Sequence, residues 1–305
     1  MFKKILFATT GTSSCDAAAR VAFDLARRYG ADLHAIHVFG IPPRSYSQTV
    51  TDIQTGRQVD LNEDDLKKVE NELVNTYARQ IESYKICQFA VMAGIPHTEI
   101  LRLARKQDVD LIIMGARTGP EENSHVRLLA GRTLQGVARS ARCPVLIIGR
   151  AAASFWGGIT RIVLGTDFSK ASDSAFMFSL QLARAFDCAI HFFHAIDISP
   201  GPFEITRTQN EIEDRIRAAH EIMRKKYVPR LEGFTNYEID AWEGTPYVEI
   251  VKFAREKFAD LIVMAHHTKR TDPDKSVLGS TVEQVALRSN CPVISINHPD
   301  KIGTY

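Results

Sequence analysis

Short apolar runs alternate along the chain with longer stretches whose apolar residues recur at helical spacing. A helix is expected between the first two runs, because Ala18, Val21, Ala22 and Leu25 fall on one face. A long charged helix is expected over Asn62–Tyr84. The strands expected in this part of the chain are Ile5–Ala8, Leu33–Phe39, Ile86–Met92, Asp110–Met114 and a last run ending at Ile148. This alternation predicts an α/β domain with a five-stranded, parallel, doubly wound sheet.

The whole pattern occurs twice. Ile5–Val38 aligns with Ile162–Ala195 at an offset of 157 residues, and Gly94-Ile-Pro96 matches Gly244-Thr-Pro246 at an offset of 150 residues. Residues identical in the two copies include Thr9 and Thr166, Asp16 and Asp173, His34 and His191, and His37 and His194. A repeat of this length has the size of a domain. We therefore expect two tandem Rossmann-like domains, over 1–150 and 161–305, joined by a linker over 151–160.

The second copy repeats the expected elements of the first. Its strands are expected at Ile162–Gly165, Ala189–Ala195, Tyr237–Trp242, Asp260–Met264 and a last run ending at Ile296, with a charged helix over Gln209–Leu231. Pro96 and Pro246 each suit the first turn of a helix, where the missing N–H is not needed.

Composition narrows the classes of function. A formal net charge of +2 over 305 residues does not favour a nucleic-acid partner. No apolar run is long enough to cross a membrane, and the first one stops at Thr9, too early for a signal peptide. We therefore expect a cytoplasmic protein. Its five cysteines include no Cys-x-x-Cys pair, so Cys143 and Cys291, each followed by Pro-Val, are expected to be packed in the core.

Ligands of doubly wound sheets bind beyond the carboxyl ends of the strands, which directs attention to the turns after the first and fourth strands. After the first strand lie Thr10-Gly11 in copy one and Thr166-Asp-Phe-Ser169 in copy two. After the fourth strand, copy one has Gly115-Ala-Arg-Thr-Gly119 and later Gly131-Arg132-Thr133, and copy two has Ala265-His-His-Thr268 and later Gly279-Ser280-Thr281.

Taken in order with the closing Cys-Pro-Val strands, these blocks resemble the universal stress protein family over nearly the whole chain, as two complete copies. Nucleotide-binding members of that family carry Gly-x-x-Gly, nine further residues, and then Gly-Ser or Gly-Thr. Glycines let the backbone approach phosphate oxygens, and the N–H groups at a helix N-terminus favour an anion. An acidic residue after the first strand marks the nucleoside side of the pocket. The resemblance therefore implies ATP or another adenine nucleotide, with Mg²⁺ only as its companion.

The resemblance, carried over position by position, gives two sets of candidate nucleotide-binding residues. They are Thr10, Gly11, Val38, Gly115, Gly119, Gly131, Arg132 and Thr133 in copy one, and Asp167, Ala195, Ala265, His266, Gly279, Ser280 and Thr281 in copy two. If copy one binds a nucleotide, the Arg132 guanidinium is expected to hold a phosphate.

Each copy departs from the family pattern in its own way. Copy one has Thr10 in place of the acidic residue and Arg132 in place of Ser. Copy two keeps Asp167 but has Ala265 and Thr268 in place of the loop glycines. If those positions need positive φ, each replacement costs on the order of 1 kcal/mol.

Purely structural explanations stand beside the functional ones. Gly131 and Gly279 could serve close helix–strand packing, and Asp167 with Ser169 could form a helix N-cap. His266 and His267 suggest zinc, but neighbours on a strand point to opposite faces. The chain has neither a P-loop nor a nucleophile elbow, so no catalytic residue is assigned.

Three functions are therefore in competition: a nucleotide-binding stress sensor, an adaptor that kept the fold and lost the nucleotide, and a weak ATP-hydrolysing enzyme. The resemblance also implies dimerisation through the last strand. Val145–Ile148 is accordingly expected to pair with Val293–Ile296 in an intramolecular pseudo-dimer, and a homodimer of whole chains stays open.

Overall fold

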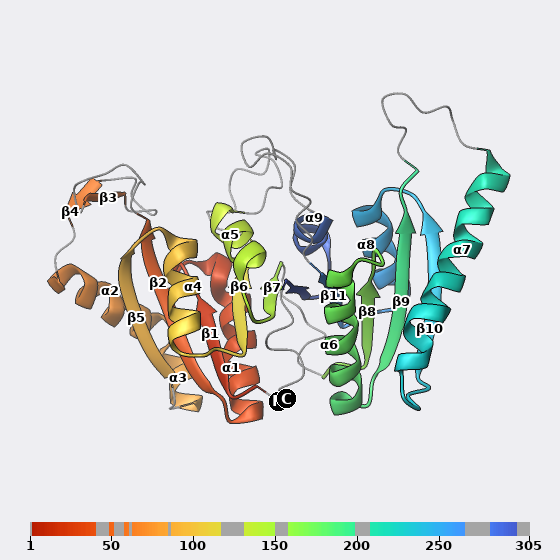
Figure 1. The fold of residues 1–305 in the computed structure, drawn as a ribbon. Coiled ribbons are helices and arrows are strands. Elements are labelled where there is room, and N and C mark those ends of the chain that lie inside the picture. Colours follow the sequence, from red (N-terminus) through yellow and green to blue (C-terminus); the bar gives the residue numbers. More distant parts are fainter. Residues whose placement is uncertain are drawn as a thin grey trace. The chain divides into compact units, whose positions relative to one another are not determined.

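The computed structural model describes residues 2–40, 49–51, 58–60, 63–84, 87–116, 131–149, 158–198, 208–265 and 281–297. The chain forms two compact units: unit 1 contains Met1–Ile148 and unit 2 contains Gly149–Thr304 (Figure 1). The expected pairing of the last strands of the two copies stays a prediction.

Each unit contains a parallel sheet of the expected kind. The strands of unit 1 are β1 (Lys4–Ala8), β2 (Asp32–Gly40), β5 (Cys87–Gly94), β6 (Leu111–Gly115) and β7 (Val145–Ile148), in the order β7-β6-β1-β2-β5. Those of unit 2 are β8 (Arg161–Gly165), β9 (Ala189–Ile196), β10 (Tyr237–Glu243), β11 (Leu261–Ala265) and β12 (Val293–Ile296), in the order β12-β11-β8-β9-β10. The predicted α/β class and the five parallel strands per copy are confirmed within the described residues.

Helices cover both faces of each sheet. Unit 1 has α1 (Asp16–Tyr29) after a 3₁₀ turn at Ser13–Cys15, then α2 (Glu63–Thr76), α3 (Ala78–Ser83), α4 (Pro96–Lys106) and α5 (Arg132–Ser140). Unit 2 has α6 (Lys170–Phe186), α7 (Gln209–Tyr227) followed by a 3₁₀ turn at Val228–Arg230, α8 (Pro246–Glu256) and α9 (Thr281–Arg288). Pro96 and Pro246 begin α4 and α8, as predicted.

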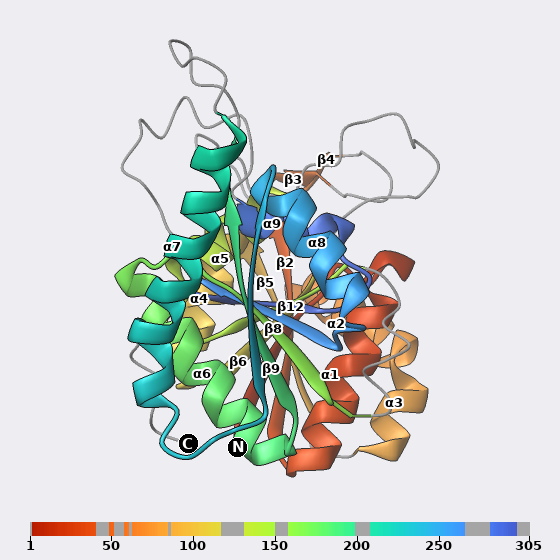
Figure 2. The ribbon, with the colours of Figure 1, turned by 90° about the vertical axis from the view of Figure 1, so that its right-hand side faces the viewer.

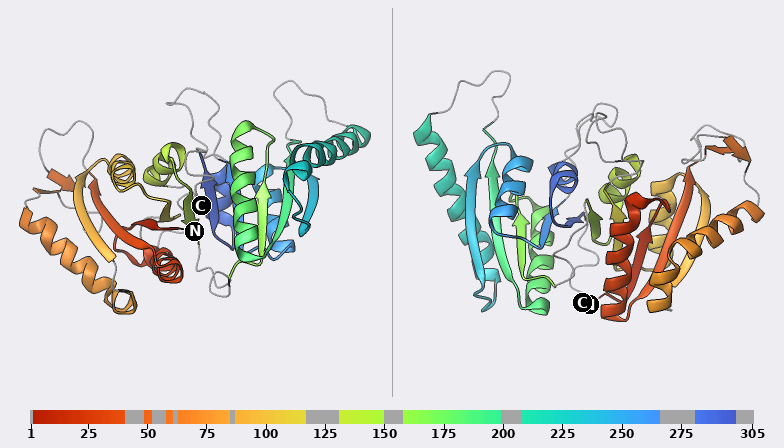
Figure 3. Two further views of the ribbon diagram at one scale, coloured as in Figure 1. Left: turned by 60° about the horizontal axis from the view of Figure 1, so that its bottom comes forward. Right: turned by 180° about the vertical axis from the view of Figure 1, so that it is seen from behind.

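Strand order and crossover handedness decide which face each helix covers. Crossovers between parallel strands are right-handed, so reversing the direction of travel across the sheet moves the helix to the other face. In unit 1, α1, α2 and α3 therefore lie on one face and α4 and α5 on the other (Figure 3, left). In unit 2, Figure 2 shows α6 and α7 to the left of β9 and β10 and α8 to the right.

The two long charged helices are shorter than predicted. The segment expected as Asn62–Tyr84 breaks at Tyr77, which separates α2 from α3, and the segment expected as Gln209–Leu231 leaves the α-helix after Tyr227, where Pro229 follows in a 3₁₀ turn. Both tyrosines are buried, with relative exposures of 1% and 0%. A short antiparallel pair, β3 (Thr49–Thr51) with β4 (Gln58–Asp60), was not predicted at all.

The expected strands Asp110–Met114 and Asp260–Met264 each begin one residue too early. Both aspartates lie just before the strand and accept backbone N–H groups at the start of the central strand. Asp110 Oδ2 accepts from Lys3 and Lys4 at 2.9 and 3.0 Å. Asp260 Oδ2 accepts from the Thr160 and Arg161 amides at 2.8 and 3.1 Å and from the Thr160 hydroxyl at 2.7 Å. These carboxylates align the central strands with their neighbours at the amino edge of each sheet.

The cysteines expected in the core are there. Cys143 and Cys291 are buried, and burial raises the pKa of the Cys291 thiol to about 11. Within the part of the chain that the structure describes, no helix has both the length and the apolar character of a membrane span.

We expect Asp260→Ala to lower the free energy of unfolding of unit 2 by about 2 kcal/mol, because three donors lose one carboxylate. Asp110→Ala should act in the same direction on unit 1. Hydrogen exchange in increasing urea, resolved by peptide, measures each unit separately. Glu221→Ala, which removes only an exposed ion pair with Lys225, is the control and should have little effect. An equal effect of all three changes would contradict this assignment.

Candidate functional site

The strand order reverses between the first and fourth strands of each copy. Because these two strands are parallel neighbours, the turns after them lie side by side at the same edge of the sheet. The register pairs Ala8 with Met114 in unit 1 and Gly165 with Met264 in unit 2. One residue further on, Thr9 follows β1 beside Gly115, and Thr166 follows β8 beside Ala265. The predicted ligand edge is built around these threonines.

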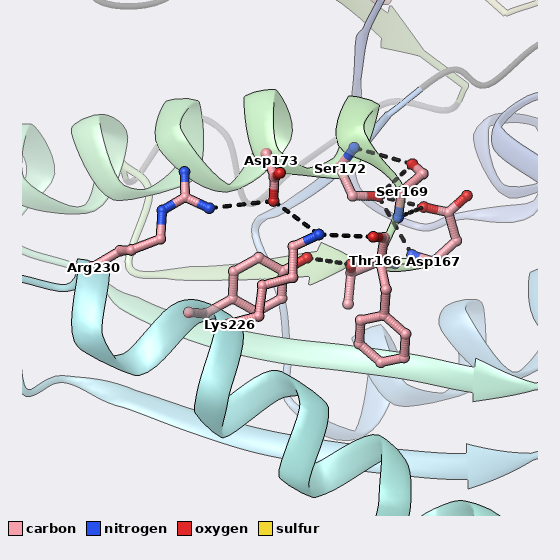
Figure 4. Close-up of polar contacts among 9 residues, drawn as sticks. Thr166, Asp167, Ser169, Ser172, Asp173, Lys226 and Arg230 are labelled. Carbon is pink, nitrogen blue, oxygen red and sulfur yellow. Dashed lines mark hydrogen bonds and ion pairs between the residues drawn. The ribbon is translucent and has the colours of Figure 1, made fainter.

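In unit 2, Thr166 is bound through its side chain, as Figure 4 shows, and also through its backbone. Its Oγ1 lies 2.6 Å from the hydroxyl of Tyr227, at the end of α7, and accepts the Phe168 N–H at 3.1 Å. Its carbonyl oxygen lies 2.7 Å from Nδ1 of His194 on β9. A carbonyl only accepts, so this nitrogen of His194 carries the proton. Thr166 thus joins the end of the central strand β8 to the neighbouring strand β9 and to the end of helix α7.

Unit 1 repeats this arrangement with its own residues. Thr9 Oγ1 lies 2.6 Å from the Tyr77 hydroxyl and accepts the Gly11 N–H at 3.0 Å, and its carbonyl lies 3.0 Å from Nδ1 of His37. Burial raises the pKa of Tyr77 and of Tyr227 to about 12, so both phenols stay protonated at neutral pH. The two tyrosines match at the same offset of 150 residues as Gly94 and Gly244, which is the signal that sequence reasoning missed.

Asp167 lies at an exposed position on the turn after β8. Its Oδ1 accepts the Ser169 N–H at 3.0 Å and the Ser172 hydroxyl at 2.6 Å. Ser169 is the N-cap of α6 and accepts the Ser172 N–H through its own hydroxyl at 3.2 Å. The predicted N-cap is therefore real, and it holds a carboxylate at the edge where the family pattern places the nucleoside.

The corresponding turn of unit 1 carries no carboxylate. Thr10 Oγ1 lies 2.7 Å from Thr12 Oγ1, which lies 2.7 Å from Ser14 Oγ. Thr10 also lies 3.3 Å from the sulfur of Cys15, the residue that takes the place of Ser172. A neutral row of hydroxyls thus replaces the acidic turn of unit 2.

The other candidate residues fall at the same edges. At the strand ends, Gly115 and Ala265 are the last residues of β6 and β11, and Val38 and Ala195 lie near the ends of β2 and β9. At the helix starts, Gly131 is the N-cap of α5, followed by the exposed Arg132 and by Thr133 in its first turn. Thr281 is the first residue of α9. Four candidates, Gly119, His266, Gly279 and Ser280, lie outside the described residues, as does Thr268. The zinc hypothesis for His266-His267 is therefore untested, and the described residues contain no group of three or more His, Cys, Asp or Glu side chains suited to a metal.

Of the two replaced loop glycines, only position 265 lies in the described residues, and it does not need a positive φ. Gly131 has φ −60°, and Gly115 and Ala265 are strand residues, so alanine at 265 brings no backbone strain. In the turn after the first strand of each copy, a positive φ occurs at Gly11 (72°) and at the equivalent Phe168 (64°). Phe168 is an aromatic residue in a conformation that favours glycine, which costs on the order of 1 kcal/mol or more. Its ring stacks on His194 with centroids 4.3 Å apart.

The histidines of this edge are neutral at physiological pH. Burial lowers the pKa of His37 and of His194, while the bonds to the threonine carbonyls oppose the shift. The charge of Asp167 also opposes the lowering of the His194 pKa. Both histidines bind a threonine carbonyl through Nδ1, with His37 buried and His194 half-buried. His191 differs, because its buried Nε2 has no hydrogen-bond partner among the described residues, although its Nδ1 lies 3.1 Å from Glu238.

Comparisons with known proteins find one family in both halves of the chain. The model of the universal stress protein family matches residues 1–149 and 158–297. A universal stress protein of Methanocaldococcus jannaschii is 31% identical over 148 residues, which are 46% of this chain and 84% of that protein. A universal stress protein of Thermus aquaticus is 30% identical over 148 residues, 48% of this chain and 99% of that protein. The crystal structure of a universal stress protein from Archaeoglobus fulgidus shares the fold over 97% of both chains, with a TM-score of 0.70 and 20% identity.

We expect Tyr227→Phe to lower the free energy of unfolding of unit 2 by about 1–2 kcal/mol, because the buried Thr166 hydroxyl loses its partner. Tyr77→Phe should do the same in unit 1. Urea titration with peptide-resolved hydrogen exchange measures both. Tyr237→Phe is the matched control, since the Tyr237 hydroxyl makes no hydrogen bond within the described residues. A loss as large in Tyr237→Phe would contradict the role of the pair.

His194 should make unit 2 less stable in mild acid. Its folded pKa lies below the unfolded value of about 6.5, so its contribution is complete above that pH and is lost as the pH falls through the folded pKa. His194→Asn keeps an N–H donor for the Thr166 carbonyl but cannot titrate. We therefore expect a shallower decline of unit 2 stability between pH 7 and pH 5 in this variant. His37→Asn should flatten the decline of unit 1 only, and unchanged slopes in both variants would refute the prediction.

Proposed function

Because the chain belongs to the universal stress protein family, with a domain of that family in each half, we propose that it is a cytoplasmic stress-response protein that binds an adenine nucleotide in unit 2. The observation that carries the proposal is the exposed Asp167 carboxylate. It lies on a fixed turn at the point where the strand order reverses. This is where doubly wound sheets bind their ligands.

The chemistry of this edge suits a nucleoside. A carboxylate accepts hydrogen bonds from ribose hydroxyls or from the exocyclic amine of adenine. Alanines at 195 and 265 keep the neighbouring strand ends small. The first turn of α9 begins at Thr281, and amides at a helix N-terminus favour phosphate. Mg²⁺ would accompany a triphosphate as part of the ligand.

Unit 1 offers a different set of groups. Its turn has Thr10 and a row of neutral hydroxyls where unit 2 has Asp167. It keeps the exposed Arg132 at the first turn of α5, where a guanidinium fork suits a phosphate. We propose that any nucleotide in unit 1 binds more weakly and that Arg132 holds its phosphate.

The adaptor without a nucleotide is the second candidate, and a specific observation favours it. Asp167 already serves the N-cap of α6, so its retention has a structural explanation. Mass spectrometry of protein purified without added nucleotide separates the two functions. A co-purified adenine nucleotide supports binding, and its absence together with no binding in solution supports the adaptor. A phosphate-release assay with Mg²⁺ tests the third candidate, weak ATP hydrolysis.

We expect isothermal titration with ATP, ADP and AMP to detect binding to the full chain. Asp167→Asn should weaken it about tenfold, because a charged acceptor becomes neutral, whereas Thr10→Val should leave it unchanged. Asparagine keeps an oxygen for the Ser169 and Ser172 donors, so the N-cap survives and thermal unfolding checks this. A second, weaker binding event that Arg132→Ala removes would locate a ligand in unit 1. No heat from any nucleotide, with protein shown to carry none, would reject the proposal.

A further inference from the structure

The backbone of Phe168 is bound on both sides although its φ is unfavourable. Its N–H donates to Thr166 Oγ1, and its carbonyl oxygen accepts from Nζ of Lys226 at 2.7 Å (Figure 4). Lys226 and Tyr227 are consecutive residues at the end of α7. Tyr227 therefore holds the turn after β8 by a neutral hydrogen bond with Thr166, and Lys226 holds it by a charged one to Phe168. Hydrogen bonds from an ammonium group are stronger than neutral ones, so the bond from Lys226 adds substantially to fixing the turn.

Lys226 is itself held in place. Its Nζ lies 3.1 Å from Asp173 Oδ1 in the first turn of α6, and the same oxygen lies 3.2 Å from Nη1 of Arg230. Arg230 lies over the ring of Phe176, with Cζ 4.8 Å from the centroid. The Lys226 side chain is only 25% exposed. An ammonium group on a flexible stem is thus confined to one position, pointing at the turn.

Among its described residues, unit 1 has the neutral hydrogen bond, between Thr9 and Tyr77, but no charged one to this turn. Thr76 stands where Lys226 stands, at the same offset of 150 residues as Tyr77 and Tyr227, and Gln80 stands where Arg230 stands. The Thr76 hydroxyl donates to the Glu72 carbonyl of its own helix at 2.8 Å. Asp16 is retained, but the cations that face Asp173 in unit 2 are replaced. Gly11 takes the positive φ of this turn without strain.

Among the described residues, the charged contact between Lys226 and the Phe168 carbonyl therefore occurs in the copy that keeps the acidic residue. The copy that has Thr10 instead shows no equivalent contact. Asp167 lies between two bound residues of the turn, Thr166 and Phe168. We propose that Lys226 is a positioning residue that fixes this turn, so that unit 2 presents the Asp167 carboxylate preorganised for its ligand. This inference rests on the proposed function of unit 2. Preorganisation raises affinity because less freedom is lost on binding.

The test compares Lys226→Met, Lys226→Arg and Lys225→Met in the full chain. Lys225 is the matched control, since it is the neighbouring lysine, 80% exposed, and pairs only with Glu221 among the described residues. Hydrogen exchange of peptides over 165–172, without nucleotide, reports the turn. Titration with AMP reports binding, and urea titration reports the stability of unit 2.

We expect Lys226→Met to speed exchange of the turn about tenfold and to weaken AMP binding about tenfold, with Lys225→Met like the wild type. Lys226→Arg keeps a charged donor for the Phe168 carbonyl and for Asp173, and should restore most of both. Unchanged exchange in Lys226→Met, equal acceleration across all peptides of unit 2, or unchanged AMP affinity would each overturn the positioning role. Absence of binding of ATP, ADP and AMP by the wild type would instead overturn the proposed function, and the exchange result alone would then decide whether Lys226 fixes the turn.

Discussion

The candidate site in each unit depends on one buried threonine at the end of the central strand. Thr9 and Thr166 bond to a tyrosine hydroxyl, to the amide two residues ahead and, through the carbonyl, to a histidine on the next strand. A buried polar group left without a partner is costly, so these bonds are mutually required. They set the direction in which the chain leaves the strand. The residues of the following turn build on this arrangement.

The two units differ in what they build on the shared threonine. Unit 2 adds a carboxylate, an aromatic residue in a strained conformation and a lysine that binds its carbonyl. Unit 1 has hydroxyls, a glycine and no equivalent lysine. Strain held by specific contacts is typical of functional sites. The duplication therefore kept the scaffold, while the electrostatics and rigidity of the turn diverged. This divergence is why we propose unit 2 as the nucleotide-binding copy.

Sequence reasoning reached the elements more securely than the contacts between them. Continuous apolar runs and the repeat predicted the parallel strands, because strands buried on both faces need apolar residues throughout. Sequence reasoning missed the helix break at Tyr77. A helical pattern indicates that a tyrosine can be buried, but it does not show what the tyrosine hydroxyl will bind. Sequence reasoning also placed Asp110 and Asp260 inside strands, where they are instead acceptors for the neighbouring strand. The condition of positive φ at position 265 was not met for a related reason, because the backbone of Ala265 follows the strand that it ends.

The sequence by itself determined the duplication, the α/β class, the family and the edge where a ligand would bind, because periodicity and ordered motifs are properties of the chain alone. It also revealed that Thr10 and Asp167 differ at equivalent positions. Only the tertiary structure decided that Asp167 supports the Ser169 N-cap of α6, that Phe168 has a positive φ and that Lys226 holds the turn. Lys226 lies 58 residues from Phe168. Such contacts are created by folding, when a helix end is brought beside a strand end, and no local pattern encodes them.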